Sequence, residues 1–256
     1  MNTNSKMTDK IKNYIYPLIT FISILLIWQF IVVNYNIPQY IMPSPIDIIE
    51  VFFTDTANLK MNALVTLYES ILGFIFSVVL ALIIGTIMDF IPFIKKCFYP
   101  LMLVSQMIPT ITIAPLLIIW FGFDLLPKII MVIATCFFPI LISFVDGIES
   151  IDKDYINLFK TMESNKLNTF IHLKLPMSLE SLFTGLKISA TYAFVAATVA
   201  EWLGGSIGLG VYMVRAKSAY ALDKVFASTI LVIIFSLIFV MVVNILKKIT
   251  LKHKGE

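Results

Sequence analysis

The sequence predicts an all-α polytopic membrane protein with six transmembrane helices in one domain over residues 1–256. Of the 256 residues, 59% are hydrophobic and only 14% are charged, whereas charged residues make up roughly a quarter of an ordinary soluble domain. Several apolar runs reach about 20 residues, the length that a helix needs to cross the hydrocarbon core of a bilayer. Helices satisfy their own backbone polar groups there, so we expect every span to be helical.

Six apolar runs, separated by charged or turn-forming residues, mark the predicted spans. The first run is longer than the apolar core of a signal peptide, and no small-residue cleavage pattern follows it in NYNIPQYIMPSP, so we expect a membrane span. The last run is bracketed by Lys224 and Lys247. The predicted spans cover residues 15–33, 64–88, 98–121, 129–145, 188–203 and 225–246.

Lysine and arginine are divided unequally between alternate loops. One set of loops and termini holds thirteen of them and the other holds five, with Lys187 left at the entry to the fifth span. Basic residues concentrate on the cytoplasmic side of a membrane. We therefore expect both termini to be cytoplasmic, together with the long loop between the fourth and fifth spans.

Groups that could perform catalysis are scarce. His172 and His253 are the only histidines, and the chain has no HExxH pair, no G-x-S-x-G elbow and no Cys/His cluster. We interpret Cys97 and Cys136 as small apolar residues. The phosphate-binding pattern G-x-x-x-x-G-K-[ST] is also missing. We expect no catalytic residue and no metal ligand, and any ATP hydrolysis would need another subunit.

The third predicted span contains Pro100, Pro109 and Pro115 around the stretch SQMIPTITIAP. Each interior proline removes a backbone hydrogen bond and bends the helix axis. A broken helix at membrane depth is tolerated where it lines a cavity or packs against protein, which is typical of a conduit. Gln106, inside this span, needs a polar partner or water. The alternative is a proline-kinked packing helix in which Gln106 bonds to a neighbour.

The fifth predicted span carries small residues at helical spacing and is followed by the glycine-rich stretch GGSIGLG. Small residues four apart let another helix approach closely, and glycines permit backbone shapes that other residues resist. Glu201 lies near the outer end, where a carboxylate indicates either a pathway-facing side chain or an interfacial position. The small residues are Ala193, Ala196, Ala197, Ala200 and Gly204. The candidate residues of a translocation path are Gln106, Pro109, Pro115 and Glu201.

The loop over residues 146–181 is the most informative segment. Its apolar residues recur at a period that favours short amphipathic helices over a disordered linker. Such helices must lay their apolar stripe against the ends of the spans, the membrane surface or another protein. We expect Pro176 to end or bend the helix before the chain re-enters the membrane. The recurring apolar residues are Ile156, Phe159, Met162, Leu167, Phe170, Ile171 and Leu175.

At this loop the sequence resembles the permease subunits of binding-protein-dependent ABC importers, whose signature opens with Glu-Ala-Ala, continues with a glycine and closes with Ile-x-Leu-Pro. The residues 173–176, LKLP, are similar to the closing part, and TGLK follows. IMPSP, IPTITIAPLLIIWFGFDLLPKI and ATVAEWLGGSIGLG resemble further family signatures, so the resemblance covers nearly the whole chain. The branch that it resembles includes sulfonate, taurine and nitrate permeases and those for the pyrimidine precursor of thiamine. AEWLGGSIGLGVYM looks most like the last group.

The opening of the signature differs in this chain. Asn157, Leu158 and Phe159 stand where the family has Glu-Ala-Ala, and Glu163 stands where it has glycine. Glycine suits a tight bend because it lacks a Cβ. We therefore expect this loop to turn by a different local geometry.

The resemblance implies a MetI-like ABC permease fold around a translocation path for a small solute, in the cell membrane of a prokaryote. It implies a second permease copy in a homodimer, cytoplasmic ABC ATPases that bind ATP and Mg, and an extracytoplasmic substrate-binding lipoprotein. This chain would hold no cofactor, contact membrane lipid and bind no nucleic acid. ATP-driven closure of the ATPases would push the two loops together and open the permease outward.

The same resemblance implies that residues 155–176 contain a coupling helix that docks on the ATPase. The expected coupling residues are Phe159, Thr161, Glu163, Ser164, Leu167, Phe170, Leu175 and Pro176.

A gradient-driven secondary transporter or channel is the alternative from a different class. Such carriers often place ionisable residues near the middle of the bilayer. This sequence keeps its charged residues near the ends of the predicted spans, which argues against ion coupling. These residues are Glu69, Asp89, Lys187 and Glu201.

Overall fold

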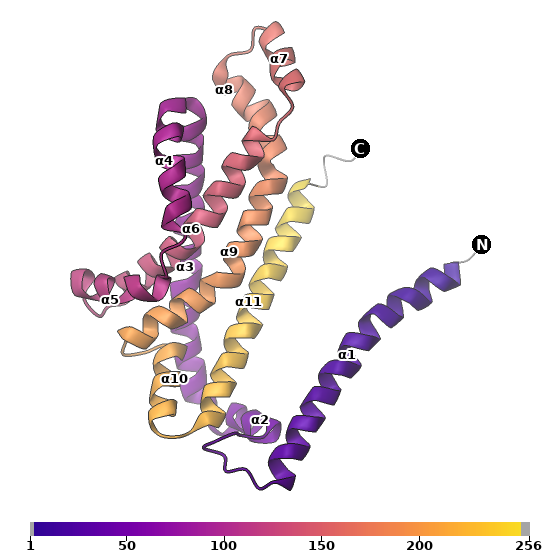
Figure 1. The fold of residues 1–256 in the computed structure, drawn as a ribbon, viewed down its shortest axis with the longest axis vertical. Coiled ribbons are helices and arrows are strands. Elements are labelled where there is room, and N and C mark those ends of the chain that lie inside the picture. The colour runs from indigo at the N-terminus through magenta and orange to yellow at the C-terminus, as the bar shows by residue number, and fades with distance from the viewer. Residues whose placement is uncertain (1–2, 252–256) are drawn as a thin grey trace.

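A computed structural model describes residues 3–251, and within that range every regular element is helical (Figure 1). Five of its helices are long and apolar enough to cross a membrane, or six if a bent pair counts as one span. The elements are α1 Thr3–Asn34, α2 Pro45–Thr54, α3 Thr56–Phe90, α4 Pro92–Ser105, α5 Thr110–Phe121, α6 Leu125–Glu149, α7 Lys153–Thr161, α8 Lys166–Thr169, the π-helical turn η1 Phe170–Lys174, α9 Leu175–Leu203, α10 Leu209–Ser218 and α11 Leu222–Leu251.

Helices α3 and α6 approach each other closely because glycines face bulky partners. Gly73 of α3 lies against Val132 of α6, and a Cβ at Gly73 would come within 2.5 Å of the Val132 Cβ. Gly85, further along α3, has no room for a side chain beside Phe144 of α6. Val132 and Phe144 are both fully buried. Because protein interiors are close-packed, a larger residue at either glycine would push the two helices apart.

The small-residue face predicted for the fifth span is confirmed in α9. The Ser189 hydroxyl donates to the Cys136 carbonyl of α6 at 2.8 Å, and the Cys136 thiol donates to the Ser189 carbonyl at 3.5 Å. Polar side chains thus join α6 and α9 where their backbones are close. Gly204, at the end of the face, lies against Ile118 of α5. The four buried alanines of this face are Ala193, Ala196, Ala197 and Ala200.

The third predicted span, residues 98–121, is broken near its middle, as its prolines led us to expect. Helix α4 ends at Ser105, helix α5 begins at Thr110, and their axes differ by 103°. Pro109, at the N-cap of α5, explains the break: it lacks an amide hydrogen, and its ring disfavours a helical conformation in the residue before it. Figure 1 shows α5 turning aside from the long helices.

The fifth predicted span, residues 188–203, is much shorter than the helix that contains it. Helix α9 begins at Leu175, so its first half carries Glu180 and Lys187. A span predicted from an uninterrupted apolar run ends where a charged residue occurs. A helix does not have to end there, because its backbone hydrogen bonds form whether the side chains are charged or apolar. The sequence pattern therefore located the apolar part of α9 and missed the part that extends toward α8.

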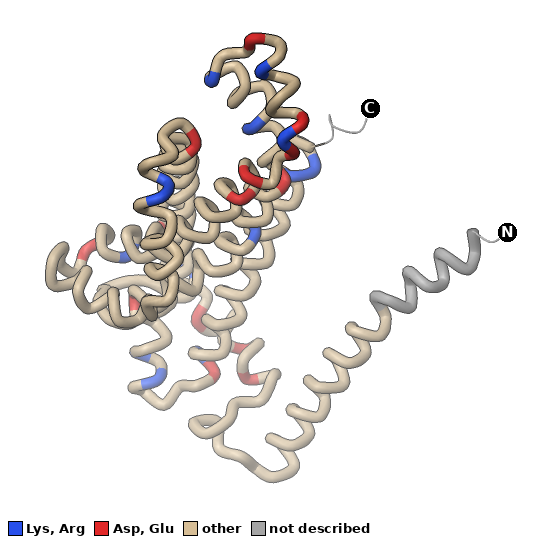
Figure 2. The backbone as a smooth tube through the Cα atoms, turned by 45° about the horizontal axis from the view of Figure 1, so that its top comes forward, with Lys and Arg blue, Asp and Glu red and all other residues tan. Residues whose placement is uncertain are grey.

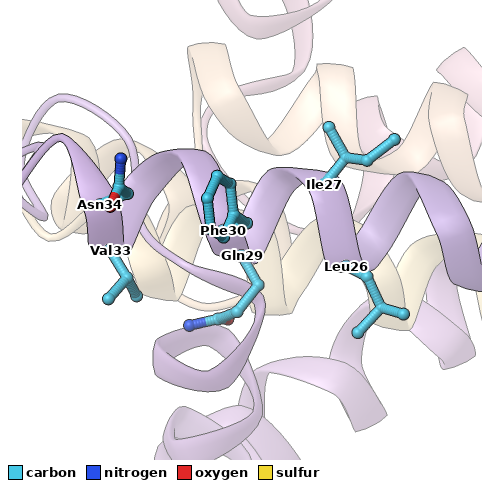
Figure 3. A pocket seen from close by; sticks show the side chains of 6 residues that line it. All are labelled: Leu26, Ile27, Gln29, Phe30, Val33 and Asn34. Carbon is cyan, nitrogen blue, oxygen red and sulfur yellow. The ribbon is translucent and has the colours of Figure 1, made fainter.

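Helix α1 leaves the bundle at an angle and contacts it near its own C-terminal end (Figure 1), where the Trp28 ring lies 5.6 Å from the Phe226 ring of α11. Only 6% of its most apolar stretch is buried. Figure 3 shows a pocket of about 690 Å³ along this helix, lined by Leu26, Ile27, Gln29, Phe30, Val33 and Asn34. A helix that stays this apolar and this exposed is suited to lipid or to another protein.

The bundle has two distinct ends. Helices α7 and α8 lie at one end with the last turns of α3 and α11, and α2 and α10 lie at the other (Figure 1). Figure 2 shows lysine, arginine and acidic residues gathered on the α7–α8 segment and again near α10. This arrangement places the loop of residues 155–176 at one end and the GGSIGLG stretch at the opposite end.

Candidate functional site

Helix α7 presents an apolar face to its surroundings at one end of the bundle. Residues three or four apart lie on the same face of a helix. Tyr155, Leu158 and Met162 follow that spacing and are 51%, 54% and 68% exposed. An exposed stripe of this kind needs a partner surface.

The turn after α7 is built around Glu163, which has the left-handed backbone conformation with φ of +54°. The Glu163 amide donates to the Lys160 carbonyl, and the Ser164 amide donates to the Phe159 carbonyl, both at 3.0 Å. These two bonds define a Schellman motif, which usually has glycine at its left-handed position. The expectation of a different local geometry is therefore wrong, because the hydrogen bonds hold glutamate in the conformation that suits glycine.

Beyond this turn, α8, η1 and α9 follow one another without a break from Lys166 to Leu203. In the π-helical turn, the Leu175 amide donates to the Phe170 carbonyl. Pro176 then lies in the first turn of α9, where a missing amide hydrogen is tolerated. Of the two outcomes expected at Pro176, an end or a bend of the helix, the end is wrong for this reason.

Two contacts hold the loop on the end of α3. Lys174 Nζ lies 2.6 Å from Asp89 Oδ1, and the rings of Phe170 and Phe90 are 5.5 Å apart. Phe170 is only 7% exposed, so its expected place on a docking surface is wrong. The loop is instead anchored by Phe170 on its inner side, which leaves its outer side for contacts.

The other expected coupling residues differ in exposure, and none is fully buried. The exposed members are Thr161, Glu163 and Leu167, and the half-buried members are Phe159, Ser164, Leu175 and Pro176. Sequence reasoning missed Tyr155 and Leu158 as surface residues. The signal that identifies them is helical spacing: Leu158 lies three residues after Tyr155 and four residues before Met162.

The break between α4 and α5 contains two of the expected path residues, Gln106 and Pro109, and both are exposed. The side chain of Gln106 has no hydrogen-bond partner in the described part of the chain, so the alternative of a helix in which Gln106 bonds to a neighbour is not observed. Pro115 lies further on, inside α5, and is also exposed. The break thus presents an unpaired amide beside a helix end.

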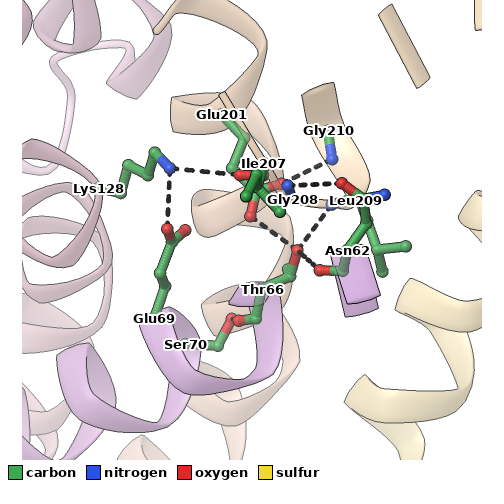
Figure 4. A network of polar contacts seen from close by, with 10 residues as sticks. All are labelled: Asn62, Thr66, Glu69, Ser70, Lys128, Glu201, Ile207, Gly208, Leu209 and Gly210. Carbon is green, nitrogen blue, oxygen red and sulfur yellow. Dashed lines mark hydrogen bonds and ion pairs between the residues drawn. The ribbon is translucent and has the colours of Figure 1, made fainter. Parts of the chain in front are cut away.

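Glu201 lies in a buried polar network at the end of the bundle opposite α7 (Figure 4). Its carboxylate accepts hydrogen bonds from the Thr66 hydroxyl at 2.7 Å and from the Gly210 amide at 2.6 Å. Glu201 is 1% exposed. In the described chain the Glu201 carboxylate is therefore surrounded by protein groups and does not face an open pathway.

An ion pair completes this network. Lys128 Nζ lies 2.9 Å from Glu69 Oε1, and both side chains are nearly inaccessible to solvent. Lys128 also donates to the Ile207 carbonyl at 3.5 Å. Lys128 lies just before the predicted fourth span, residues 129–145, but α6 already begins at Leu125 and buries the lysine beside α3.

The glycine-rich stretch fits against the same network. The amide of Gly208 donates to Asn62 Oδ1, and the amide of Leu209 donates to the Thr66 hydroxyl, both at 2.9 Å. Gly208 has φ of +139°, and a Cβ there would overlap the Glu201 carboxylate. The start of α10 is therefore locked to α3 and α9. Asn62, Thr66 and Glu69 are spaced by four and three residues, which is the signal that places them on one face of α3.

A second polar cluster joins α2, α10 and α11 through Asp55. Its carboxylate lies 2.6 Å from Lys224 Nζ, 2.7 Å from the Tyr212 hydroxyl and 2.6 Å from the Asn58 amide. Burial alone would raise the pKa of Asp55, but the hydrogen bonds from these three groups outweigh burial and hold the pKa below its usual 3.8. Burial and the Asp55 carboxylate raise the pKa of Tyr212.

No set of three or more histidine, cysteine or acidic side chains gathers within residues 3–251 in a way that could hold a metal ion. Cys97 is exposed and Cys136 is buried, and both are free thiols. What the described residues do provide is a projecting apolar loop at one end, a helix break in the middle and a locked polar network at the other end.

Several known proteins are similar to this chain in sequence or in fold. Residues 77–253 match the family described as "Binding-protein-dependent transport system inner membrane component". A "Probable ABC transporter permease protein" of Haemophilus influenzae is 33% identical over 86% of this chain and 90% of its own length. The "Formylaminopyrimidine transport permease protein ThiX" of Halalkalibacterium halodurans is 33% identical over 82% of this chain and 84% of its own length.

A more distant relative and one solved structure are also similar to this chain. The "Putative aliphatic sulfonates transport permease protein SsuC" of Bacillus subtilis is 27% identical over 91% of this chain and 85% of its own length. A chain of the MetNI methionine ABC transporter in an inward-facing conformation superimposes with a TM-score of 0.64, covering 74% of this chain and 94% of that chain at 15% identity. The likeness at that identity is one of fold.

Proposed function

Because the chain belongs to the binding-protein-dependent transport system inner membrane component family, we propose that it forms the translocation path of an ATP-driven importer for a small organic solute. It is a permease subunit of the ABC importer type. The match over residues 77–253 is the observation that carries this conclusion. The family is a transport component, so we assign ATP hydrolysis, with its Mg, to a separate cytoplasmic subunit.

The coupling of ATP hydrolysis to this permease is assigned to α7 and the turn around Glu163. The apolar face of Tyr155, Leu158 and Met162 supports this assignment, because it projects from the bundle and has no cover within the described chain. The anchors at Phe170 and Lys174 support it as well, because a loop fixed to α3 can pass a displacement on to the bundle. In this proposal the outer side of the loop docks on an ABC ATPase.

The wider assembly follows from the same proposal. A second copy of the chain would complete the translocation path in a homodimer, with lipid around it and with both termini and α7 in the cytoplasm. A substrate-binding lipoprotein would approach the opposite end, near α10. The excess of lysine and arginine on the α7 side of the sequence supports this orientation.

The solute is proposed to be a pyrimidine precursor of thiamine. A relative named for formylaminopyrimidine transport is 33% identical to this chain, whereas one named for aliphatic sulfonates is 27% identical. A sulfonate is the alternative solute, and the lower identity to the sulfonate relative makes it the second choice.

The coupling proposal is tested by placing charge on the apolar face of α7. Glu substitutions at Leu158 and Met162 together should abolish copurification with the ATPase encoded beside this permease, because a docked apolar surface would have to bury two carboxylates. Tyr220→Glu is the matched control, since Tyr220 is 73% exposed and follows α10, the helix at the end of the bundle opposite α7. Retained copurification and ATPase activity in the double variant would refute docking through α7.

A further inference from the structure

A half-open pocket of about 290 Å³ lies at the break between α4 and α5, against α6 and α9. Residues from all four helices or their ends contribute to it, including Gln106 from the break, Phe138 and Pro139 from α6 and Tyr192 from α9. Pockets that hold drug-sized ligands have volumes of about 300–1,000 Å³. The volume at this break therefore suits a single-ring solute and is small for a larger one.

The polar groups of this pocket have hydrogen-bonding capacity to spare. The Gln106 amide and the Tyr192 hydroxyl have no partner in the described part of the chain. The Thr135 hydroxyl donates to the Met131 carbonyl at 2.9 Å, so its remaining capacity toward the pocket is as an acceptor. Together these side chains offer both donors and acceptors to a ligand.

The walls of the pocket are apolar and neutral. Phe138 and the Tyr192 ring provide aromatic surface, and Pro139 and Ile113 provide aliphatic surface. Of the described residues that line the pocket, none carries a charge. An anion such as a sulfonate would lose its hydration here without gaining a counter-charge, whereas a neutral planar ring can stack on the aromatic side chains.

The geometry points to a solute subsite at the α4–α5 break that binds a neutral, planar, nitrogen-containing ring. An aminopyrimidine fits the chemistry: its amino group donates to Thr135 or to the Gln106 carbonyl oxygen, and its ring nitrogens accept from the Gln106 amide or the Tyr192 hydroxyl. This inference rests on the proposed function, because it identifies the pocket as part of the import path. It adds that the permease itself contributes to the choice between neutral rings and anions.

Equilibrium binding of radiolabelled 4-amino-2-methylpyrimidine to the full-length chain in lipid nanodiscs tests the subsite. Gln106→Ala and Tyr192→Phe should each weaken binding by about threefold to tenfold, the effect of losing one neutral hydrogen bond. Gln39→Ala and Tyr68→Phe are the matched controls, because Gln39 and Tyr68 are exposed away from this pocket and their substitution should leave binding unchanged. Ethanesulfonate should not compete with the probe.

Three results would overturn the subsite: no binding of the probe to the wild-type chain, equal binding in wild-type and Gln106→Ala/Tyr192→Phe chains, or competition by ethanesulfonate. Probe binding is measured both on the chain alone and on its complex with the ATPase. A failure of the subsite proposal can therefore be distinguished from a failure of the proposed transport function. Loss of probe binding in a complex that still forms and hydrolyses ATP refutes the subsite only. Absence of any ATPase complex refutes the proposed function only.

Discussion

Replacing Glu163 with glycine should stabilise the turn that follows α7. Glu163 occupies the left-handed position of the Schellman motif with φ of +54°, where its Cβ is crowded by the backbone. Glycine has no Cβ and adopts this conformation without that penalty. The hydrogen bonds from the Glu163 and Ser164 amides, each 3.0 Å long, should therefore open less often in the glycine variant.

The magnitude follows from two opposing contributions. A non-glycine residue in the left-handed region costs about 1–2 kcal/mol, and glycine costs about 0.5–1 kcal/mol in additional entropy lost on folding. The net stabilisation of Glu163→Gly is then about 0.5–1 kcal/mol, which corresponds to about a twofold to fivefold decrease in local opening.

Hydrogen exchange followed by mass spectrometry, on peptides covering residues 158–170 of the protein in nanodiscs, measures this opening. Glu163→Ala is the control for charge, because it removes the carboxylate near the C-terminus of α7 but keeps the Cβ. Glu50→Gly is the control for glycine in a regular helix, and exchange in α2 should become faster by a similar factor. If Glu163→Ala slows exchange as much as Glu163→Gly does, the argument from backbone conformation is refuted.

Three further predictions concern the buried network, the Asp55 cluster and the topology. Lys128→Met should destabilise the protein by about 3–5 kcal/mol, because it leaves Glu69 buried without its partner. Adding Glu69→Gln should recover part of this loss in a double-mutant cycle measured by thermal unfolding. Additive effects of the two substitutions would contradict the pairing. The pKa of Asp55 is lowered on folding, so its ionised form stabilises the fold above the unfolded value of about 3.8, and this contribution is lost as pH falls through the lower folded value. The difference in thermal stability between wild type and Asp55→Asn should therefore be constant above pH 5 and shrink below pH 4, and a difference that shrinks between pH 5 and 8 would disprove this. A membrane-impermeant maleimide should label a cysteine placed at Ser206 from outside intact cells and leave one placed at Met162 unlabelled, and the reverse pattern would invert the topology.

Much of the helical architecture could be predicted because it depends on local properties of the chain. Apolar runs of sufficient length, as in residues 225–246, must form helices in a bilayer, and the small residues of α9 must face a close neighbour. The position of the break in the third span was harder to predict from the sequence. Three prolines mark that region, but which of them separates two helices depends on how α5 packs against α6 and α9, and the sequence pattern does not contain that packing.

The buried network could not be predicted because its partners are distant in sequence. Thr66 and Glu201 are 135 residues apart, and Glu69 and Lys128 are 59 apart. From the sequence alone, Glu201 could be interpreted as an interfacial residue because it lies near a span end. Only the folded structure shows that its carboxylate accepts a hydrogen bond from the Gly210 amide. Glu163 shows the opposite case: the departure from glycine suggested a changed turn, but hydrogen bonds to Phe159 and Lys160 override the local preference of one residue.

Cross-linking from the apolar face of α7 tests the central claim most directly. A photoreactive benzophenone maleimide is attached to Met162→Cys in a chain whose exposed Cys97 has been changed to serine, and to Tyr220→Cys in the same background as the control at the opposite end. Illumination of the assembled importer should join position 162, but not position 220, to the ATP-hydrolysing subunit. A cross-link to that subunit from position 220 and none from position 162 would contradict coupling through α7.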